Sequence, residues 1–180
     1  MIVFDIETQN LAAEVGGWGN KQLLRLAVAC TWDEFTGYRL WWESQAVDLI
    51  QELRNHDLIV GYNINSFDFQ VLSFYSETKG LEKRSFDILG EISRQGFKRI
   101  SQRELAARNL DAAISQESGV VAVRLWRQGK IMEAAAKCQT DVDLSKRLFD
   151  LWQNQGLLWL NVTDFVMWPG IDHLLDFRDR

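Results

Sequence analysis

The chain has 180 residues, the size of one domain, and 47% of them are hydrophobic, which excludes a disordered chain. The net charge of −5 argues against a protein that binds nucleic acid through bulk positive charge. No apolar run approaches about 18 residues, so we expect no membrane-spanning helix. Two cysteines, and a first segment without a signal-peptide pattern, predict a cytoplasmic protein.

The hydrophobic pattern indicates alternating strands and helices. It predicts strands at 2–4, 23–32, 38–42, 58–60 and 85–89, a loop at 16–19, and helices at 45–55, 66–79, 101–110 and 130–155. Ser44 and Ser101 are expected to cap helices, and Gly80 and Gly156 to end them. This order is typical of an α/β fold with a mixed sheet and helices on its faces. We expect residues 1–180 to form one domain, with 157–180 as a C-terminal extension.

A pair of acids follows the first strand. Asp5 and Glu7 are two residues apart, so their carboxylates point to the same side of the strand. Two like charges at the end of a buried strand are costly unless a cation neutralises them, and a metal ion would do so. A chance pair of acids at the start of a loop is the alternative.

Two further segments carry acids with helical context. Asp68 lies in the first turn of a predicted helix, where a carboxylate also gains from the helix dipole, and Asn63 before it suits a turn. In the last predicted helix, the apolar stripe turns Asp141 inward and leaves Asp143 beside Arg147 on the solvent side.

These segments read FDIET at 4–8, VGYNINSFD at 60–68 and KCQTDV at 137–142. Together they resemble the DEDD superfamily of 3′–5′ exonucleases, and within it small prokaryotic predicted exonucleases related to the proofreading domain of family B DNA polymerases. Residues 14–18 (EVGGW) and 125–130 (LWRQGK) are similar to that small family too. The resemblance spans most of the chain, with 157–180 least covered.

The resemblance implies a ribonuclease H-like mixed sheet of five or six strands with helices on both faces. It implies that two divalent ions, Mg²⁺ or Mn²⁺, are held by four carboxylates: Asp5, Glu7, Asp68 and Asp141. One ion would activate a water and the other would stabilise the leaving oxygen. It further implies that the substrate, a single-stranded DNA or RNA end, is contacted by residues of the first two motifs: Thr8, Asn63 and Phe67.

One position departs from the family pattern. A tyrosine four residues before the last aspartate, or a histidine five residues before it, orients the attacking water in related enzymes. Lys137 and Ala136 stand there in this chain. Lys137 is one helical turn from Asp141, so it is a candidate catalytic residue that would contact the phosphate or orient water. The alternative is a salt bridge to Asp141 and no more.

Aromatic residues and one histidine give weaker signals. Trp18 would either stack on a base or anchor its loop to the core. Trp41 and Trp42 lie on opposite faces of a strand, and a surface rich in tryptophan would suit a protein partner. His173 would replace the missing water-orienting group only if the C-terminal tail folds over the site.

Three functions are consistent with this sequence. The first is a metal-dependent 3′–5′ exonuclease, and the second is a catalytically weak module that binds nucleic acid or a protein. The third is an endonuclease of the same fold. Charge distribution supports a nucleic-acid substrate, because residues 79–137 hold 12 Lys and Arg against 7 Asp and Glu.

Overall fold

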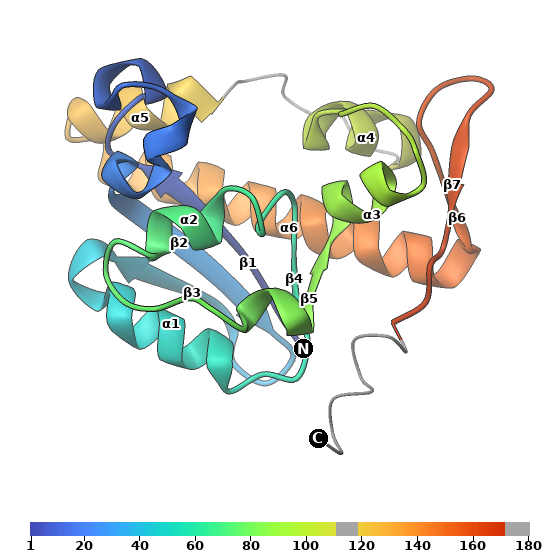
Figure 1. Ribbon diagram of the computed structural model, residues 1–180, viewed down its shortest axis with the longest axis horizontal. Coiled ribbons are helices and arrows are strands. Elements are labelled where there is room, and N and C mark those ends of the chain that lie inside the picture. Colours follow the sequence, from blue (N-terminus) through green and yellow to red (C-terminus); the bar gives the residue numbers. More distant parts are fainter. Residues whose placement is uncertain (111–118, 172–180) are drawn as a thin grey trace.

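The computed structural model describes residues 1–110 and 119–171 (Figure 1). In this part of the chain the main sheet has five strands: β1 Ile2–Thr8, β2 Leu26–Asp33, β3 Gly37–Trp42, β4 Ile59–Gly61 and β5 Ser85–Asp87. A separate hairpin pairs β6 Leu157–Trp159 with β7 Phe165–Met167. The α-helices are α1 Ala46–Arg54, α2 Asp68–Leu72, α3 Ile88–Arg94, α4 Gln102–Asn109, α5 Gly119–Arg127 and α6 Ile131–Gln155. Short 3₁₀ helices are η1 Ala12–Val15, η2 Trp18–Leu24, η3 Glu43–Gln45 and η4 Leu81–Arg84.

The sheet is mixed, with strand order β3-β2-β1-β4-β5. The strands β1, β2 and β3 are antiparallel neighbours, whereas β4 runs parallel to β1 and β5 parallel to β4. The predicted mixed sheet with helices on both faces is confirmed.

Alternation along β1 separates two hydrophobic cores. Ile2 and Phe4 face α1 and α2, and Phe4 stacks on Phe69 of α2 with ring centroids 5.6 Å apart. Val3 faces the other side, where the long helix α6 crosses the sheet and contributes Cys138 (Figure 1). Both faces of the central strand are therefore covered by helices.

The pairing of β1 with β4 is short. It consists of Ile2 opposite Ile59 and Val3 opposite Val60, while β2 pairs with β1 from Val3 to Thr8. The second half of β1 thus has one edge that no strand covers, and the segment after β4 turns there toward α2.

Several sequence-based boundaries were wrong. The helix predicted at 66–79 is only α2, because Tyr75 leaves the helical path and its hydroxyl donates to Glu43 while accepting the Leu26 N–H. Gly80 precedes η4 and does not end α2. Ser44 lies inside η3 and caps no helix. The loop expected at 16–19 runs into η2, which delays β2 to Leu26.

The predicted helix cap at Ser101 and the predicted helix end at Gly156 are confirmed, whereas two helices and a hairpin were not predicted. Ser101 caps α4 by accepting the Glu104 N–H, and Gly156 ends α6 in the left-handed conformation. The strand predicted at 85–89 stops at Asp87, whose side chain caps α3 by accepting the Gly90 N–H. Helices α3 and α5 and the β6–β7 hairpin were not predicted.

The described part of the C-terminal extension packs on the main core. Leu158 and Val166 of the hairpin are buried, and Trp168 stacks on Phe86 with ring centroids 5.0 Å apart. In the described part of the chain, no helix has both the length and the apolar character needed to cross a membrane.

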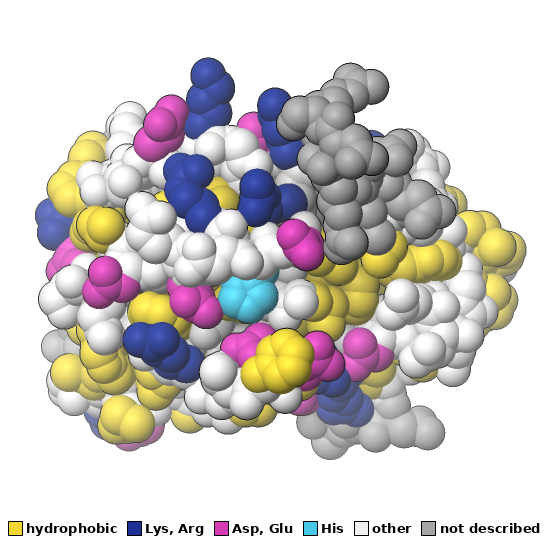
Figure 2. All heavy atoms as spheres, turned by 90° about the horizontal axis from the view of Figure 1, so that it is seen from below, with side chains coloured by type: hydrophobic (Ala, Val, Ile, Leu, Met, Phe, Trp, Pro, Cys, Tyr) yellow, Lys and Arg dark blue, Asp and Glu magenta, His cyan; other side chains and the backbone are white. Residues whose placement is uncertain are grey.

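The expected tryptophan-rich surface is absent, because only Trp18 and Trp159 of the eight tryptophans are exposed. β3 is the edge strand, yet Trp41 is buried and Trp42 half-buried. Hydrophobic side chains instead gather toward the side of the hairpin, where Phe165 and Met167 are exposed (Figure 2). Over the rest of the described surface in that view, acidic and basic side chains are mixed.

Gly61, the last residue of β4, lies where this strand approaches β1 closely, and a substitution there tests that packing. A Cβ atom there would collide with Ile64 and lie 2.8 Å from the Phe4 carbonyl oxygen. We expect Gly61→Ala to destabilise the protein by about 1–3 kcal/mol, measured by thermal unfolding. The control is Gly19→Ala, where nothing lies within 4 Å of the new atom. Equal melting temperatures for the two variants would contradict this packing.

Candidate active site

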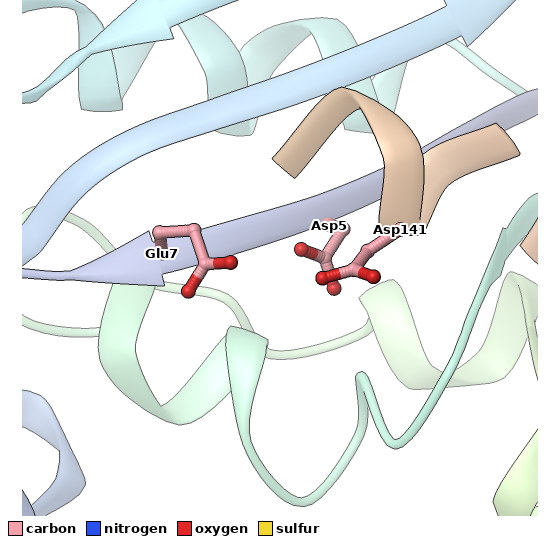
Figure 3. A group of neighbouring side chains, drawn as sticks. All are labelled: Asp5, Glu7 and Asp141. Atoms are coloured by element: carbon pink, nitrogen blue, oxygen red, sulfur yellow. The ribbon is translucent and has the colours of Figure 1, made fainter. Parts of the chain in front are cut away.

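Three carboxylates meet between β1 and α6. Asp5 and Glu7 project from the same side of β1, and Asp141 comes down from α6 (Figure 3). One oxygen from each lies within 4.8 Å of the others. The alternation of β1 explains why Asp5 and Glu7 face α6 together with Val3.

The helical phase of α6 decides which of its acids reaches the site. Asp141 is buried, as predicted, whereas Asp143 is partly exposed, pairs with Arg147 and accepts the Tyr38 hydroxyl at 3.1 Å. Cys138, one turn before Asp141, donates its thiol to the Asp5 carbonyl at 3.2 Å. This contact fixes the distance between α6 and β1.

Asp68 approaches from the uncovered edge of β1. It begins α2 and is 2% exposed, and the backbone of Ile6 lies near enough to lower its pKa in part. Its Oδ1 atom is buried and has no hydrogen-bond partner among the described residues. A buried carboxylate oxygen without a partner is costly, so Asp68 is suited to a ligand that brings positive charge.

Two basic side chains reach the same carboxylates. The ammonium of Lys137 lies 2.5 Å from Glu7 Oε1 and 2.8 Å from Asp141 Oδ2. Arg103, in the first turn of α4, lies 2.6 Å from Asp141 Oδ1. The salt bridge expected between Lys137 and Asp141 is present, and Lys137 pairs with Glu7 as well. Both cations come from the basic segment 79–137.

Burial and mutual repulsion oppose ionisation of the acids. Burial raises the pKa of Asp5 well above its ordinary value, and the charges of Asp141 and Asp68 raise it further. Burial likewise raises the pKa of Asp68. The pKa of Glu7 rises to about 7 because burial outweighs the opposing effect of Lys137. The ion pairs raise the pKa of Lys137 in spite of its burial, so it stays protonated.

These groups line a cavity of about 460 Å³. Its walls come from β1, η2, α2, α4, α5 and α6, and its lining includes Thr8, Trp18, Phe67, Gln102 and Val123. Trp18 and Phe67 meet edge to face, with ring centroids 6.3 Å apart. Trp18 is 66% exposed, so the expectation that it anchors its loop in the core was wrong.

Two residues that were predicted to contact substrate, Asn63 and Thr8, form hydrogen bonds within their own segments of the chain. Asn63 has a left-handed backbone, with φ of 66°, and its side-chain oxygen accepts the Ser66 hydroxyl at 2.5 Å; it does not line the cavity. Asp87 holds this turn by accepting the Asn63 N–H at 2.7 Å. Thr8 does line the cavity, and its hydroxyl donates to the Asn10 carbonyl at 3.1 Å.

Sequence reasoning missed Arg103, Gln102 and Tyr62. Ser101 signalled the start of α4, but no local pattern shows that α4 docks on α6, where Gln102 donates to the Asp141 carbonyl at 2.7 Å. Tyr62 lines the cavity and its hydroxyl donates to the Ile100 carbonyl at 2.7 Å. His173 lies outside the described residues.

A solved structure shares this fold. The family B DNA polymerase of the hyperthermophilic archaeon Pyrobaculum calidifontis aligns with 83% of this chain, with a TM-score of 0.64 and 15% sequence identity. The match covers 24% of the polymerase, so this chain spans about a quarter of its length. No protein-family model and no curated protein match the chain.

The match establishes the fold alone. The five-stranded mixed sheet is compatible with a ribonuclease H-like fold, as predicted from the sequence.

The donor atoms at the site fit a hard divalent ion. Four carboxylates supply only oxygen ligands, which Mg²⁺ and Mn²⁺ prefer. A bound cation would give the unpartnered Oδ1 of Asp68 a partner. It would also favour the ionised forms of Asp5 and Glu7, whose pKa values are raised. The cluster can therefore bind a metal ion.

The raised pKa values predict how stability depends on pH. Folding raises the pKa of Asp5, Glu7 and Asp68, so the folded chain binds more protons than the unfolded chain above pH values of about 4. In EDTA, the contribution of these groups to the free energy of unfolding therefore falls as the pH rises. For Glu7 this loss is complete only once the pH has risen past its folded-state pKa of about 7.

We therefore expect Asp68→Asn to raise the melting temperature in EDTA at alkaline pH, by about 2–4 °C for each kcal/mol gained. The same variant is expected to lose the stabilisation that Mn²⁺ gives the unaltered protein. Asp143→Asn, on the exposed side of α6, serves as the control and should change neither value. Equal stabilisation of Asp68→Asn and the unaltered protein by Mn²⁺ would contradict the assignment.

Proposed function

We propose that the protein is a metal-dependent 3′–5′ exonuclease that hydrolyses phosphodiester bonds at single-stranded nucleic-acid ends. The observation that carries this proposal is the meeting of Asp5, Glu7, Asp68 and Asp141 at one cavity, with a buried Asp68 oxygen left unpartnered. The polymerase match supports it through the fold, since the sequence resembles the proofreading domain of that polymerase family. A cytoplasmic location belongs to the same proposal.

The chain's own residues would bind the ion and the scissile phosphate. The four carboxylates Asp5, Glu7, Asp68 and Asp141 would provide the divalent-metal site, and the metal would supply an activated water and stabilise negative charge on the phosphate and the leaving oxygen. Lys137 and Arg103 lie at the same carboxylates and add fixed positive charge beside the phosphate. No tyrosine orients water from position 137, so we assign Lys137 to this electrostatic role.

The terminal nucleotide would lie against the aromatic wall of the cavity. Trp18 and Phe67 form this wall on the η2 and α2 side, and the large exposed face of Trp18 is free to stack on a base. Thr8 lines the cavity beside the carboxylates, while Asn63 would act through the conformation of its turn.

A second candidate function is a catalytically weak module that binds nucleic acid. The double ion pair of Lys137 favours it, because an ammonium occupies carboxylates that would otherwise be open to metal. Lys137→Tyr distinguishes the two candidates. Strong activity gained from near zero would favour the binding module, whereas reduced activity would show that Lys137 contributes to catalysis.

Cleavage and its direction test the proposal. With Mg²⁺ or Mn²⁺, we expect DNA or RNA oligonucleotides to be shortened from the 3′ end, as followed with 5′-labelled and 3′-labelled strands. Asp5→Asn and Asp141→Asn should lower the rate at least about a hundredfold, because Asp5 belongs to the proposed metal site and Asp141 holds Lys137 and Arg103 beside the phosphate. Asp143→Asn should retain activity. Intact oligonucleotides in every reaction at high enzyme concentration would refute the proposal.

Trp18 tests the aromatic wall separately. Loss of one base-stacking platform costs about 1–3 kcal/mol, so Trp18→Ala should raise KM roughly 5- to 150-fold and change kcat much less. Trp159→Ala removes the other exposed tryptophan, which lies on the hairpin, and should leave KM unchanged. Similar KM values for Trp18→Ala and Trp159→Ala would exclude stacking on Trp18.

A further inference from the structure

The net charge of the ionised side chains at the site indicates how many divalent ions it can bind. Four carboxylates contribute four negative charges when ionised, and Lys137 and Arg103 contribute two positive charges through direct ion pairs. The charge left over on these six groups is −2, which one divalent ion neutralises, and the buried Asp87 near Asp68 adds a further acid. A second divalent ion would leave the buried cluster with a net positive charge.

The cations are also distributed unevenly over the carboxylates. Both oxygens of Asp141 are taken, Oδ1 by Arg103 and Oδ2 by Lys137, and Glu7 Oε1 is taken by Lys137. Within the described part of the chain, no basic group lies within ion-pair distance of Asp5 or Asp68. The negative charge that remains is therefore concentrated at the β1–α2 end of the site.

We propose that Lys137 serves as a built-in cation in place of one metal ion, so that the site binds a single divalent ion at Asp5 and Asp68. This inference rests on the proposed function, because it concerns the metal of that same site. Lys137 is then a positioning residue. Its ammonium pairs with Glu7 of β1 and with Asp141 of α6, and so holds these two carboxylates next to each other.

The surroundings of Lys137 keep its ammonium in place. Its side chain is 9% exposed, and its two partners are equally buried at 8% and 9%. Moving the ammonium out to solvent would leave two buried carboxylates without it, which is costly. An incoming ion would have to offset that cost before it could bind Glu7 and Asp141.

The stoichiometry of Mn²⁺ binding tests the proposal without any measurement of activity. Electron paramagnetic resonance titration with Mn²⁺ alone counts bound ions, and Asp68→Asn gives the background from other surface acids. We expect one ion per unaltered chain above that background. Lys137→Met keeps the approximate length of the side chain and removes its charge. The affinity of this variant for a second ion should therefore be at least about tenfold higher than the affinity of the unaltered protein for a second ion.

Two control variants isolate the charge of Lys137. Lys137→Arg retains the cation and should bind one ion. Lys146→Met, on the same helix, breaks an i,i+4 pair with Asp150 away from the site and should also bind one ion. Should Lys137→Met fail to fold by circular dichroism, Lys137→Gln replaces it.

The possible outcomes separate this inference from the proposed function. Two ions on the unaltered protein, or one ion on the folded neutral Lys137 variant, would overturn the inference and leave a metal-dependent nuclease intact. No Mn²⁺ above the Asp68→Asn background would overturn both. One ion on the unaltered protein and two on the neutral variant would support the inference.

Discussion

Repulsion between buried carboxylates is the constraint on which this structure depends. Asp5, Asp68 and Glu7 all have raised pKa values because burial and neighbouring negative charges disfavour their ionised forms. A cluster of this kind lowers the stability of the protein that contains it, which is typical of sites kept for function. Lys137 and Arg103 offset part of the repulsion, and a divalent ion would offset the remainder.

The fold meets this constraint through a short strand and a long helix. Since β4 pairs with β1 at only two positions, the second half of β1 has an edge that β4 does not cover, and α2 can begin there beside the carboxylates. On the other face, α6 is long enough to pack Trp152 in the core near one end and to carry Lys137 and Asp141 over the end of β1. The aromatic wall and the charged wall of the cavity thus belong to opposite faces of one sheet.

Local patterns predicted much of the fold and part of the site. The alternation of β1 gave Asp5 and Glu7 a common face, and the phase of α6 turned Asp141 inward, because both periodicities are properties of the backbone. The same reasoning failed for 66–79, where a tertiary hydrogen-bond network around Tyr75 outweighs helical propensity. It also left α5 and the hairpin unpredicted, although β6 and β7 pair directly with each other across the short segment 160–164.

The sequence by itself therefore indicated the five strands of the main sheet and several of the helices that cover it, and it drew attention to four carboxylates and to the unusual lysine at position 137. Only the tertiary structure decided what that lysine does. An i,i+4 spacing allows Lys137 to reach Asp141, but its second partner, Glu7, is 130 residues away and meets it only because α6 packs across β1. Arg103 and Trp18 join the site for the same reason. Charge balance at a buried site depends on distances between separate elements, and no local pattern encodes those distances.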